Sequence, residues 1–377
     1  MKKYYLLTPG PTPVPPRVAA KASEPMLHHR TKEFGEIFSR VQEGLKYVFR
    51  TKSDILMIAG SGTAAMEAAV ANTLSPGDEV IVASVGSFGE RWVKIAEAFG
   101  IQVHAVREEW GKPADPQKIA DALKAHPKAK AVLLQHTETS AGSVNDLKTI
   151  SKIVEKSPAI LIVDSISGLG GEELHMDDWH LDVVVSGSQK GLMTAPGLAM
   201  AALSDKGWKA VESAKCPRFC SDFKRIQKSI KDNETPWTPP VSLFQSLAEA
   251  LKMIQEDTIE GVWERHRRLA RAAQAGIKAL GFPLFSSRPC SVLTAAKLPE
   301  GFDGALLIRK MLADQGVSIA GGQDHLKGKI FRLAHMGYMD SFDVLIGLTA
   351  LEKTLKDMGY KIPEPGRAAR EAEAALA

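Results

Sequence analysis

Residues 183–191 read Val-Val-Val-Ser-Gly-Ser-Gln-Lys-Gly, an apolar run followed directly by small polar residues and a lysine. The three valines predict a buried β-strand, because β-branched side chains fit a sheet that is covered on both faces. Lys190 then follows the strand at one end of the sheet. A lysine after a strand is often structural or exposed, so the role of Lys190 depends on what surrounds it.

Six further apolar runs alternate with helical patterns between about residues 50 and 205, which is typical of βαβ units and a parallel sheet. These runs are Ile55–Ile58, Val80–Ala83, Val103–Val106, Ala131–Leu134, Ile160–Val163 and Leu198–Leu203. We therefore expect an α/β fold with a mostly parallel sheet of about seven strands and helices on both faces. Ligands of such sheets bind outside the carboxyl ends of the strands. The residues just after each run are the first candidates for a functional site.

Beyond Pro240 the pattern changes to longer helices, at about 241–255, 258–280, 304–315 and 341–358, with short strands near 290–295 and 329–333. This part predicts a smaller α+β domain. We divide the 377 residues into an N-terminal segment (1–15), a large domain (16–255) and a small C-terminal domain (256–377). The tail from Glu364 is predicted to be an exposed helix or a frayed end.

The composition excludes several classes of protein. A net charge of +4, from 48 basic and 44 acidic residues, gives no broad field for nucleic acid or a membrane surface. No run approaches the roughly 18 apolar residues of a membrane span. Three cysteines cannot form a disulfide framework, so a reducing cytoplasm is expected. Cys216 and Cys220 have no further Cys or His nearby, so no metal site is predicted.

Asp164 ends the apolar run Ile160–Val163, which places a carboxylate at the mouth of a strand. Burial there is costly without a cationic partner. The protonated pyridine nitrogen of pyridoxal phosphate (PLP) is such a partner, and a nearby lysine could hold that cofactor. The alternative is an aspartate that caps the following turn.

Other polar residues follow neighbouring strands. Ser61, Gly62 and Thr63 lie between the first strand and an Ala-rich helix, and free N–H groups at a helix N-terminus suit a phosphate. Phe88 lies on a Gly-rich loop where its ring could stack on a flat heterocycle, or simply belong to the core. Thr139, in a polar cluster that also contains His136 and Glu138, could hydrogen-bond the same ligand.

Arg332 lies inside the apolar run Ile330–Leu333, where a surface arginine is not expected. Its planar guanidinium matches a carboxylate bidentately. The sequence therefore predicts that Arg332 binds a substrate carboxylate; the alternative is an arginine on the solvated face of an edge strand.

Together these residues resemble the class V aminotransferases of PLP fold type I, and within them the alanine-glyoxylate, serine-glyoxylate and serine-pyruvate group. The resemblance covers most of the chain and follows the order of the family. Its motifs are Leu-Thr-Pro-Gly-Pro-Thr (7–12), Met-Leu-His-His-Arg-Thr (26–31), Gly-Ser-Gly-Thr (60–63), His-Thr-Glu-Thr-Ser-Ala-Gly (136–142), Val-Asp-Ser-Ile-Ser-Gly-Leu-Gly (163–170), Ser-Gly-Ser-Gln-Lys-Gly (186–191) and Phe-Arg-Leu (331–333).

The resemblance implies a role for each candidate residue. Lys190 corresponds to the lysine that forms the Schiff base with PLP, and Asp164 to the partner of the ring nitrogen. The other expected cofactor contacts are Ser61, Gly62, Thr63 and Gln189 at the phosphate, Phe88 and Thr139 at the ring, and Thr238 from a second subunit. Gly10 and Arg332 are expected at the substrate. The chain departs from relatives that often carry His at the position of Thr63 and Trp at that of Phe88.

The activity implied is a PLP-dependent transamination that moves an amino group from alanine or serine to glyoxylate or pyruvate, by a homodimer with shared active sites. Three alternatives stay open: an aminotransferase of the 2-aminoethylphosphonate type, since a guanidinium also binds phosphonate; a lyase similar to cysteine desulfurases, which would need a reactive cysteine; and a non-catalytic subunit with this fold.

Overall fold

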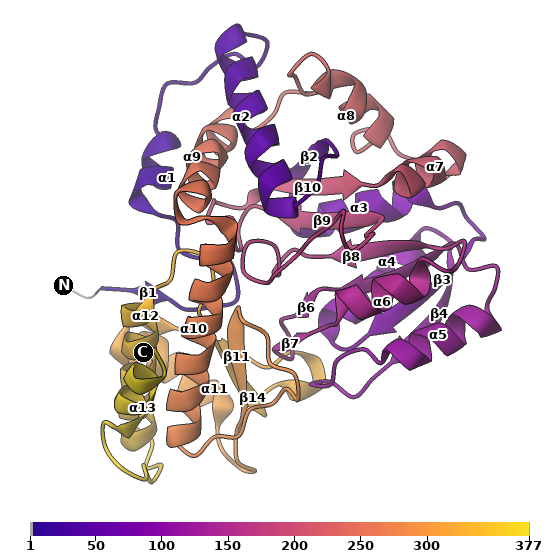
Figure 1. The fold of residues 1–377 in the computed structure, drawn as a ribbon. Helices are drawn as coiled ribbons and strands as arrows, with labels where there is room; N and C mark the ends of the chain where they lie inside the picture. The colour runs from indigo at the N-terminus through magenta and orange to yellow at the C-terminus, as the bar shows by residue number, and fades with distance from the viewer. Residues whose placement is uncertain (1–2, 377) are drawn as a thin grey trace.

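The computed structural model describes residues 3–376 and confirms the predicted α/β fold. Its central sheet has seven strands, one for each predicted run (Figure 1). In spatial order they are β2 (Ile55–Gly60), β10 (Gly197–Leu203), β9 (Val183–Gly187), β8 (Ile160–Asp164), β5 (Ala131–Gln135), β3 (Glu79–Ser84) and β4 (Gln102–Arg107). The pairings from β9 to β4 are parallel, and β10 runs antiparallel to both of its neighbours.

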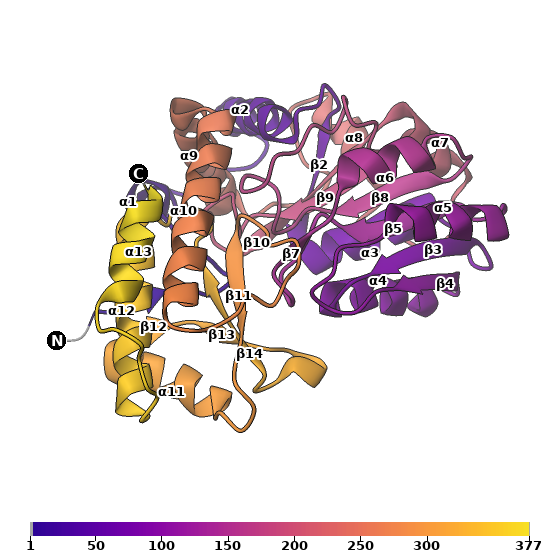
Figure 2. The ribbon, with the colours of Figure 1, turned by 60° about the horizontal axis from the view of Figure 1, so that its bottom comes forward.

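Helices cover both faces of this sheet. Figure 2 shows α5 (Pro116–Ala125) and α6 (Leu147–Val154) on one face, with α3 (Gly62–Thr73) and α4 (Ser87–Ala98) on the other. The strands are therefore buried on both sides, which explains why they read as continuous apolar runs. The same part of the chain contains α1 (Pro16–Lys21), α2 (Lys32–Phe49), α7 (Asp205–Ser213), α8 (Phe223–Ile230) and α9 (Val241–Asp257).

The C-terminal part begins with the long helix α10 (Ile259–Ala279) and contains a small antiparallel sheet. The sheet has the order β11 (Leu293–Lys297), β14 (Ile330–Ala334), β13 (Ala320–Gly321). Helices α11 (Gly304–Gln315) and α12 (Ser341–Asp357) agree with the predicted segments, and a 3₁₀ turn, η1, spans Asp324–Leu326. The strand expected near 290–295 begins later, because Cys290 instead bonds through its N–H to the carbonyl of Gly142 in the large sheet's loop region.

The N-terminal segment joins the two parts of the molecule. Strand β1 (Tyr5–Leu6) pairs in parallel with β12 (Val317–Ser318) of the C-terminal part, and Leu7 belongs to the C-terminal hydrophobic cluster. The chain then turns toward the large sheet, where the Thr12 N–H donates to the Gln189 carbonyl at 3.1 Å. This path brings residues 8–11 to the carboxyl edge of the sheet.

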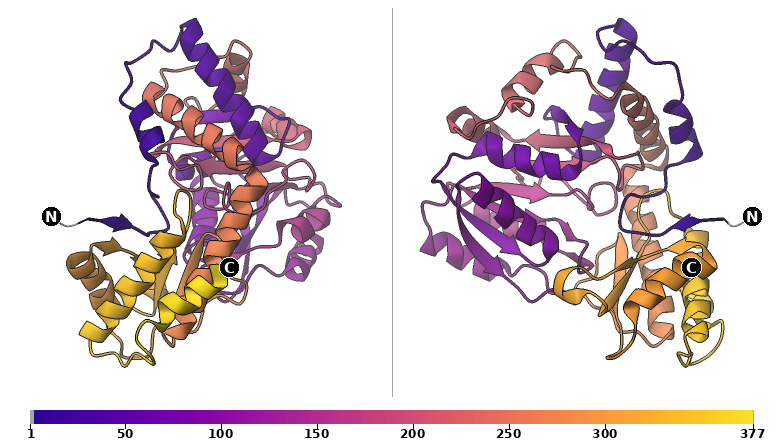
Figure 3. Two further views of the ribbon diagram at one scale, coloured as in Figure 1. Left: turned by 60° about the vertical axis from the view of Figure 1, so that its left-hand side comes forward. Right: turned by 180° about the vertical axis from the view of Figure 1, so that it is seen from behind.

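The tail from Glu364 forms a helix, as one of the two predicted alternatives had it, but one face of this helix is buried. Residues Arg367–Leu376 form α13, which packs against α10 and α12 (Figure 3). Ala368 and Ala372 are fully buried there, one turn apart on the same face. Their small side chains allow α13 to approach α10 closely. Within residues 3–376, no helix has the length and apolar character required to span a membrane.

We predict that Ala368→Glu lowers the melting temperature by several degrees, because it puts an unpaired charge into the seam between α13 and α10. Ala374→Glu is the matched control, since Ala374 is exposed on the same helix. Thermal unfolding of both variants measures the difference. Equal melting temperatures would contradict the docked position of α13.

Candidate active site

Lys190 follows β9 at the carboxyl edge of the sheet, half-buried beneath the N-terminal segment. Its Nζ donates a hydrogen bond to the carbonyl of Pro9. Gly10 lies against the same side chain with φ +133°, and a Cβ at that position would collide with Lys190. Glycine is required there for both reasons. Thr12 fixes the backbone by donating from Oγ1 to the Lys190 carbonyl at 2.9 Å.

The pKa of Lys190 is lowered to about 8, mainly by burial; the charge of Asp164 opposes this shift, and the charges of Arg332 and Arg91 add to it. An amine with such a pKa is partly neutral near pH 7. A neutral amine is a nucleophile and a base, which an ordinary surface lysine is not at that pH.

Asp164 is the last residue of β8, the strand beside β9, and only 5% of it is exposed. Its Oδ1 accepts the N–H of Ile166 at 2.8 Å, and no ion pair neutralises it within residues 3–376. Burial raises the pKa of Asp164 to about 7. A cationic ligand would favour the ionised form and repay this desolvation.

Helix α3 begins directly after β2, whose carboxyl end lies at the same edge of the sheet as that of β9. Ser61 is the N-cap of α3 but makes no side-chain cap bond, which leaves first-turn N–H groups for an anion. Gly62 is buried against Ile166, and Thr63 is half-buried. The amide oxygen of Gln189 is buried without a hydrogen-bond partner close to Gly62. This side-chain amide is therefore free to hydrogen-bond a ligand.

Phe88 lies in the first turn of α4 and is half-buried. The Glu138 carboxylate fixes its position by accepting the N–H groups of Phe88 at 3.1 Å and Gly89 at 3.0 Å. Gly86, the N-cap of α4, allows this approach, because a Cβ there would collide with Glu138. Burial raises the pKa of Glu138. The sequence had placed Glu138 in a polar cluster without giving it this role.

Arg332 lies on β14 and is 5% exposed, with its guanidinium directed at the loop that contains Thr139. Nη1 donates to the Thr139 carbonyl at 2.8 Å, and Nε and Nη2 donate to the Gly321 carbonyl at 2.9 and 2.7 Å. Three of its five N–H donors are used, and none binds a carboxylate. Two donors therefore stay available to a ligand.

Thr238 and Thr139 stay predictions as cofactor contacts. Thr238, expected to act from a second subunit, is exposed and lines a separate cavity with Ala59 and Trp237. Thr139 accepts a hydrogen bond from Arg332 through its backbone carbonyl, which leaves the expected contact of its hydroxyl with the cofactor untested. His136 is buried beside Ser165, and burial lowers its pKa to about 3, so its ring is neutral. The sequence interpretation missed Ile166 and Arg91, which both contact predicted residues.

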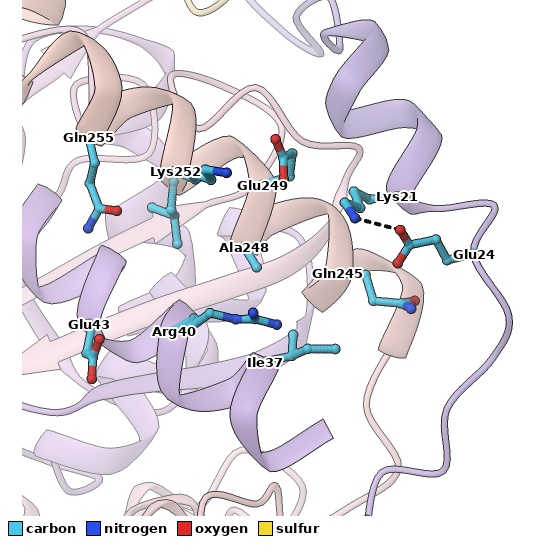
Figure 4. Close-up of a pocket in the computed structure, with 11 residues that line it drawn as sticks. Lys21, Glu24, Ile37, Arg40, Glu43, Gln245, Ala248, Glu249, Lys252 and Gln255 are labelled. Carbon is cyan, nitrogen blue, oxygen red and sulfur yellow. Dashed lines mark hydrogen bonds and ion pairs between the residues drawn. The ribbon is translucent and has the colours of Figure 1, made fainter. Parts of the chain in front are cut away.

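Two other features lie away from this group. A hollow between α1, α2 and α9 is lined by charged side chains such as Arg40, Glu43 and Glu249 (Figure 4). Among residues 3–376, Glu79, His104 and His126 are close enough to share a metal ion. Glu79 and His104 form an ion pair of 2.9 Å, and the imidazole rings of His104 and His126 stack. These contacts explain why the three side chains lie together without a metal.

Comparison with known proteins identifies this arrangement. The family model described as Aminotransferase class-V matches residues 4–339. The chain belongs to this family. It is 40% identical to the soluble hydrogenase small subunit of Synechococcus sp., over 97% of this chain and 96% of that protein. It is 34% identical to the serine–glyoxylate aminotransferase of Methylorubrum extorquens, over 97% and 94%.

The fold agrees with the family. The crystal structure of the ureidoglycine–glyoxylate aminotransferase of Bacillus subtilis superimposes with a TM-score of 0.93 and 31% identity, over 100% of this chain and 98% of that one. The aminotransferase described here thus has the fold type I architecture that its sequence predicted. PLP dependence is a property of this family.

The residues of this aminotransferase fit PLP. The Asp164 carboxylate, which has no ion-pair partner within residues 3–376, suits a protonated ring nitrogen, and the N–H groups at the start of α3 suit a phosphate. The Lys190 amine is close enough to Asp164 and Arg332 for their charges to act on its pKa.

We predict that Lys190 of the cofactor-free enzyme reacts with acetic anhydride at pH 7 far faster than its burial alone suggests. A pKa of about 8 leaves roughly a tenth of the amine neutral, against about 0.03% at the ordinary lysine value of 10.5. Competitive labelling with peptide mass spectrometry over pH 6–11 gives the midpoint. Exposed Lys124 is the internal control, and a midpoint for Lys190 above 10 would contradict the expected shift.

Proposed function

We propose that this enzyme binds PLP at Lys190 and transfers an amino group from a small amino acid, alanine or serine, to glyoxylate or pyruvate. The observation that carries this proposal is the meeting of three unneutralised groups at one edge: the lowered-pKa amine of Lys190, the carboxylate of Asp164 and the guanidinium of Arg332. Asp164 ends β8, Lys190 follows β9, and Arg332 lies on β14, far along the chain from the other two.

The chain offers contacts to each part of PLP. Asp164 would hold the ring nitrogen in its protonated form, Phe88 would lie against the ring, and Ser61, Gly62, Thr63 and Gln189 would face the phosphate. PLP held at Lys190 would exchange that link for the substrate amine, which frees the Lys190 amine, and would then withdraw electrons from the substrate Cα so that its proton becomes removable. The neutral form of the Lys190 amine, favoured by its burial, is the base that takes this proton at Nζ.

Arg332 would orient the substrate through its α-carboxylate. The two backbone carbonyls hold the guanidinium in one position before the substrate arrives, so little side-chain entropy is lost on binding. Amino acid donors and keto acid acceptors share this carboxylate. One arginine can therefore serve both halves of the reaction, and Gly10, which contacts the Lys190 side chain, would lie at the substrate.

The relatives support the proposed substrates. The names of the Methylorubrum and Bacillus proteins both include glyoxylate as the acceptor, and one includes serine as the donor. We propose the same small keto acid for this enzyme, with pyruvate as the second possibility. Side-chain preference between alanine and serine depends on one hydroxyl, and a panel of donors against glyoxylate, pyruvate and 2-oxoglutarate would resolve it.

Specific observations weigh against the alternatives. A desulfurase-like lyase needs a thiolate at the site, but burial raises the pKa of Cys290 to about 12, and exposed Cys220 lies beside Trp237. The retained Lys190, Asp164 and Arg332 argue against a non-catalytic subunit. A phosphonate substrate stays the second candidate function, because the free donors of Arg332 fit either anion.

We also propose a homodimer in the cytoplasm, in which Thr238 of one subunit reaches the phosphate site of the other. Exposure of the Thr238 segment away from Lys190 in its own subunit supports this arrangement. Three free cysteines support a reducing compartment.

Lys190→Ala is expected to abolish turnover while leaving a folded protein, because it removes the covalent anchor and the base together. Lys124→Ala, a change of an exposed lysine, should leave activity unaltered. Borohydride reduction of the enzyme with PLP, followed by peptide mapping, should locate the cofactor on Lys190. Label on another lysine would refute the assignment.

Arg332→Ala should lower kcat/KM for every amino and keto acid by roughly 30-fold to several thousand-fold, which corresponds to about 2–5 kcal/mol for loss of a shielded charged pair. Arg332→Lys should restore little, because a point charge does not reproduce the fork. The visible spectrum with PLP should not change. Full activity of Arg332→Ala on alanine, or wild-type activity on an aminophosphonate equal to that on alanine, would favour the phosphonate function.

A further inference from the structure

Arg91 connects two of the helix N-termini at the proposed cofactor site. It lies on α4, one turn after Phe88, and its Nη1 donates to the Thr63 hydroxyl at the start of α3, at 3.0 Å. Its guanidinium carbon lies 4.7 Å from the centre of the Phe88 ring, within the range of a cation–π contact. One side chain thus contacts a residue proposed at the phosphate and a residue proposed at the ring.

The position of Arg91 is fixed by its helix. Glu138 accepts the N–H groups of Phe88 and Gly89 in the first turn of α4, and Gly86 allows it to approach, so this turn cannot shift without breaking hydrogen bonds. The Gln135 side chain adds a further bond, from Nε2 to the Phe88 carbonyl at 2.8 Å. The guanidinium of Arg91 is therefore positioned by a helix whose first turn is fixed, and by its own contacts with Thr63 and Phe88.

The charge of Arg91 is not neutralised. The residue is half-buried, and within residues 3–376 no aspartate or glutamate forms an ion pair with it. Arg107, the last residue of β4, differs from Arg91 because its charge is neutralised. It donates two hydrogen bonds, of 2.8 and 3.0 Å, to the carboxylate of Glu90, which precedes Arg91 on α4. A fixed cation without a partner acts on the ionisable groups around it.

The charge of Arg91 acts on two ionisable groups of the proposed site, Asp164 and Lys190. Arg91 lowers the pKa of Asp164, which burial and the charge of Glu138 raise, and it also lowers the pKa of Lys190. Both effects favour the protonation states that the proposed function needs: an ionised Asp164 and a neutral Lys190 amine.

We propose that Arg91 is a positioning residue of the cofactor site, which links the Phe88 ring to Thr63 at the start of α3 and supplies an unneutralised positive charge that acts on Asp164 and Lys190. This inference rests on the proposed PLP function, and it assigns no direct contact between Arg91 and the cofactor phosphate.

The first test compares PLP with pyridoxal, which lacks the phosphate. Arg91→Gln should weaken the binding of both to the cofactor-free enzyme by about tenfold or more, because the stacking ring and Asp164 are affected rather than the phosphate contacts. Arg107→Gln is the matched control, since it removes a positive charge that pairs with the same helix, and it should bind both compounds as the wild type does. A loss confined to PLP would overturn the proposal in favour of a phosphate ligand.

The second test is a pH titration of the visible absorbance of the enzyme with PLP. Loss of a nearby cation makes protonation of the lysine-linked group easier, so the midpoint should rise in Arg91→Gln and stay close to wild type in Arg91→Lys. Thr63→Val keeps the charge but removes its hydrogen-bond acceptor, and should raise the midpoint by less. A purely structural role would leave the midpoint unchanged in all three.

These outcomes separate the two proposals. If the wild type shows no visible absorbance with PLP, the proposed function fails. If the wild type responds but Arg91→Gln matches it within twofold in affinity and in midpoint, only the role of Arg91 is refuted. Equal behaviour of Arg91→Lys and Arg91→Gln would also refute it, because charge would then have no effect.

Discussion

The structure depends on one electrostatic constraint, the burial of Asp164 and Lys190 at adjacent strand ends without neutralising partners. Desolvation raises the pKa of the acid and lowers that of the amine, so each is pushed toward its neutral form. The parallel sheet imposes this arrangement, because the carboxyl ends of β8 and β9 open at the same edge and helices cover both faces. A cationic heterocycle bound there would restore the charge of Asp164, so cofactor binding and the stability of the site are coupled.

Much of this could be predicted from the sequence because it depends on local patterns. The apolar runs that end at Asp164 and before Lys190 define both the strands and the sheet edge. Arg332 could be singled out in the same way, because it is a charged residue inside the apolar run Ile330–Leu333. A helix was one of the two predictions for the tail from Glu364, but its packing was not predicted, because small alanines carry little hydrophobic signal even when, as at Ala368 and Ala372, they are buried between helices.

The remaining features depend on contacts between segments that no local pattern connects. Glu138 reads as a polar residue after a strand, yet it serves as the cap of α4, a helix some fifty positions earlier in the chain. Gly86 reads as a loop glycine, yet its hydrogen side chain is what admits Glu138. Arg91 lies at helical spacing from Phe88, so a helix prediction from Ser87 could have placed the two on one face, but its contact with Thr63 required the fold.

The contacts of Arg332 suggest why three distant segments converge on Lys190. Its guanidinium bonds to Thr139 in the loop of the large sheet and to Gly321 in the small sheet, so it spans the two parts of the molecule. Residues 5–12 span them again, since Tyr5 and Leu6 pair with β12 while Thr12 bonds to the backbone at Lys190. A carboxylate on the free donors of Arg332 would therefore bind at a junction, where its position relative to Lys190 is set by both hydrophobic clusters. Small displacements of one part against the other would change the distance between substrate and base, which makes packing at this junction part of the site itself.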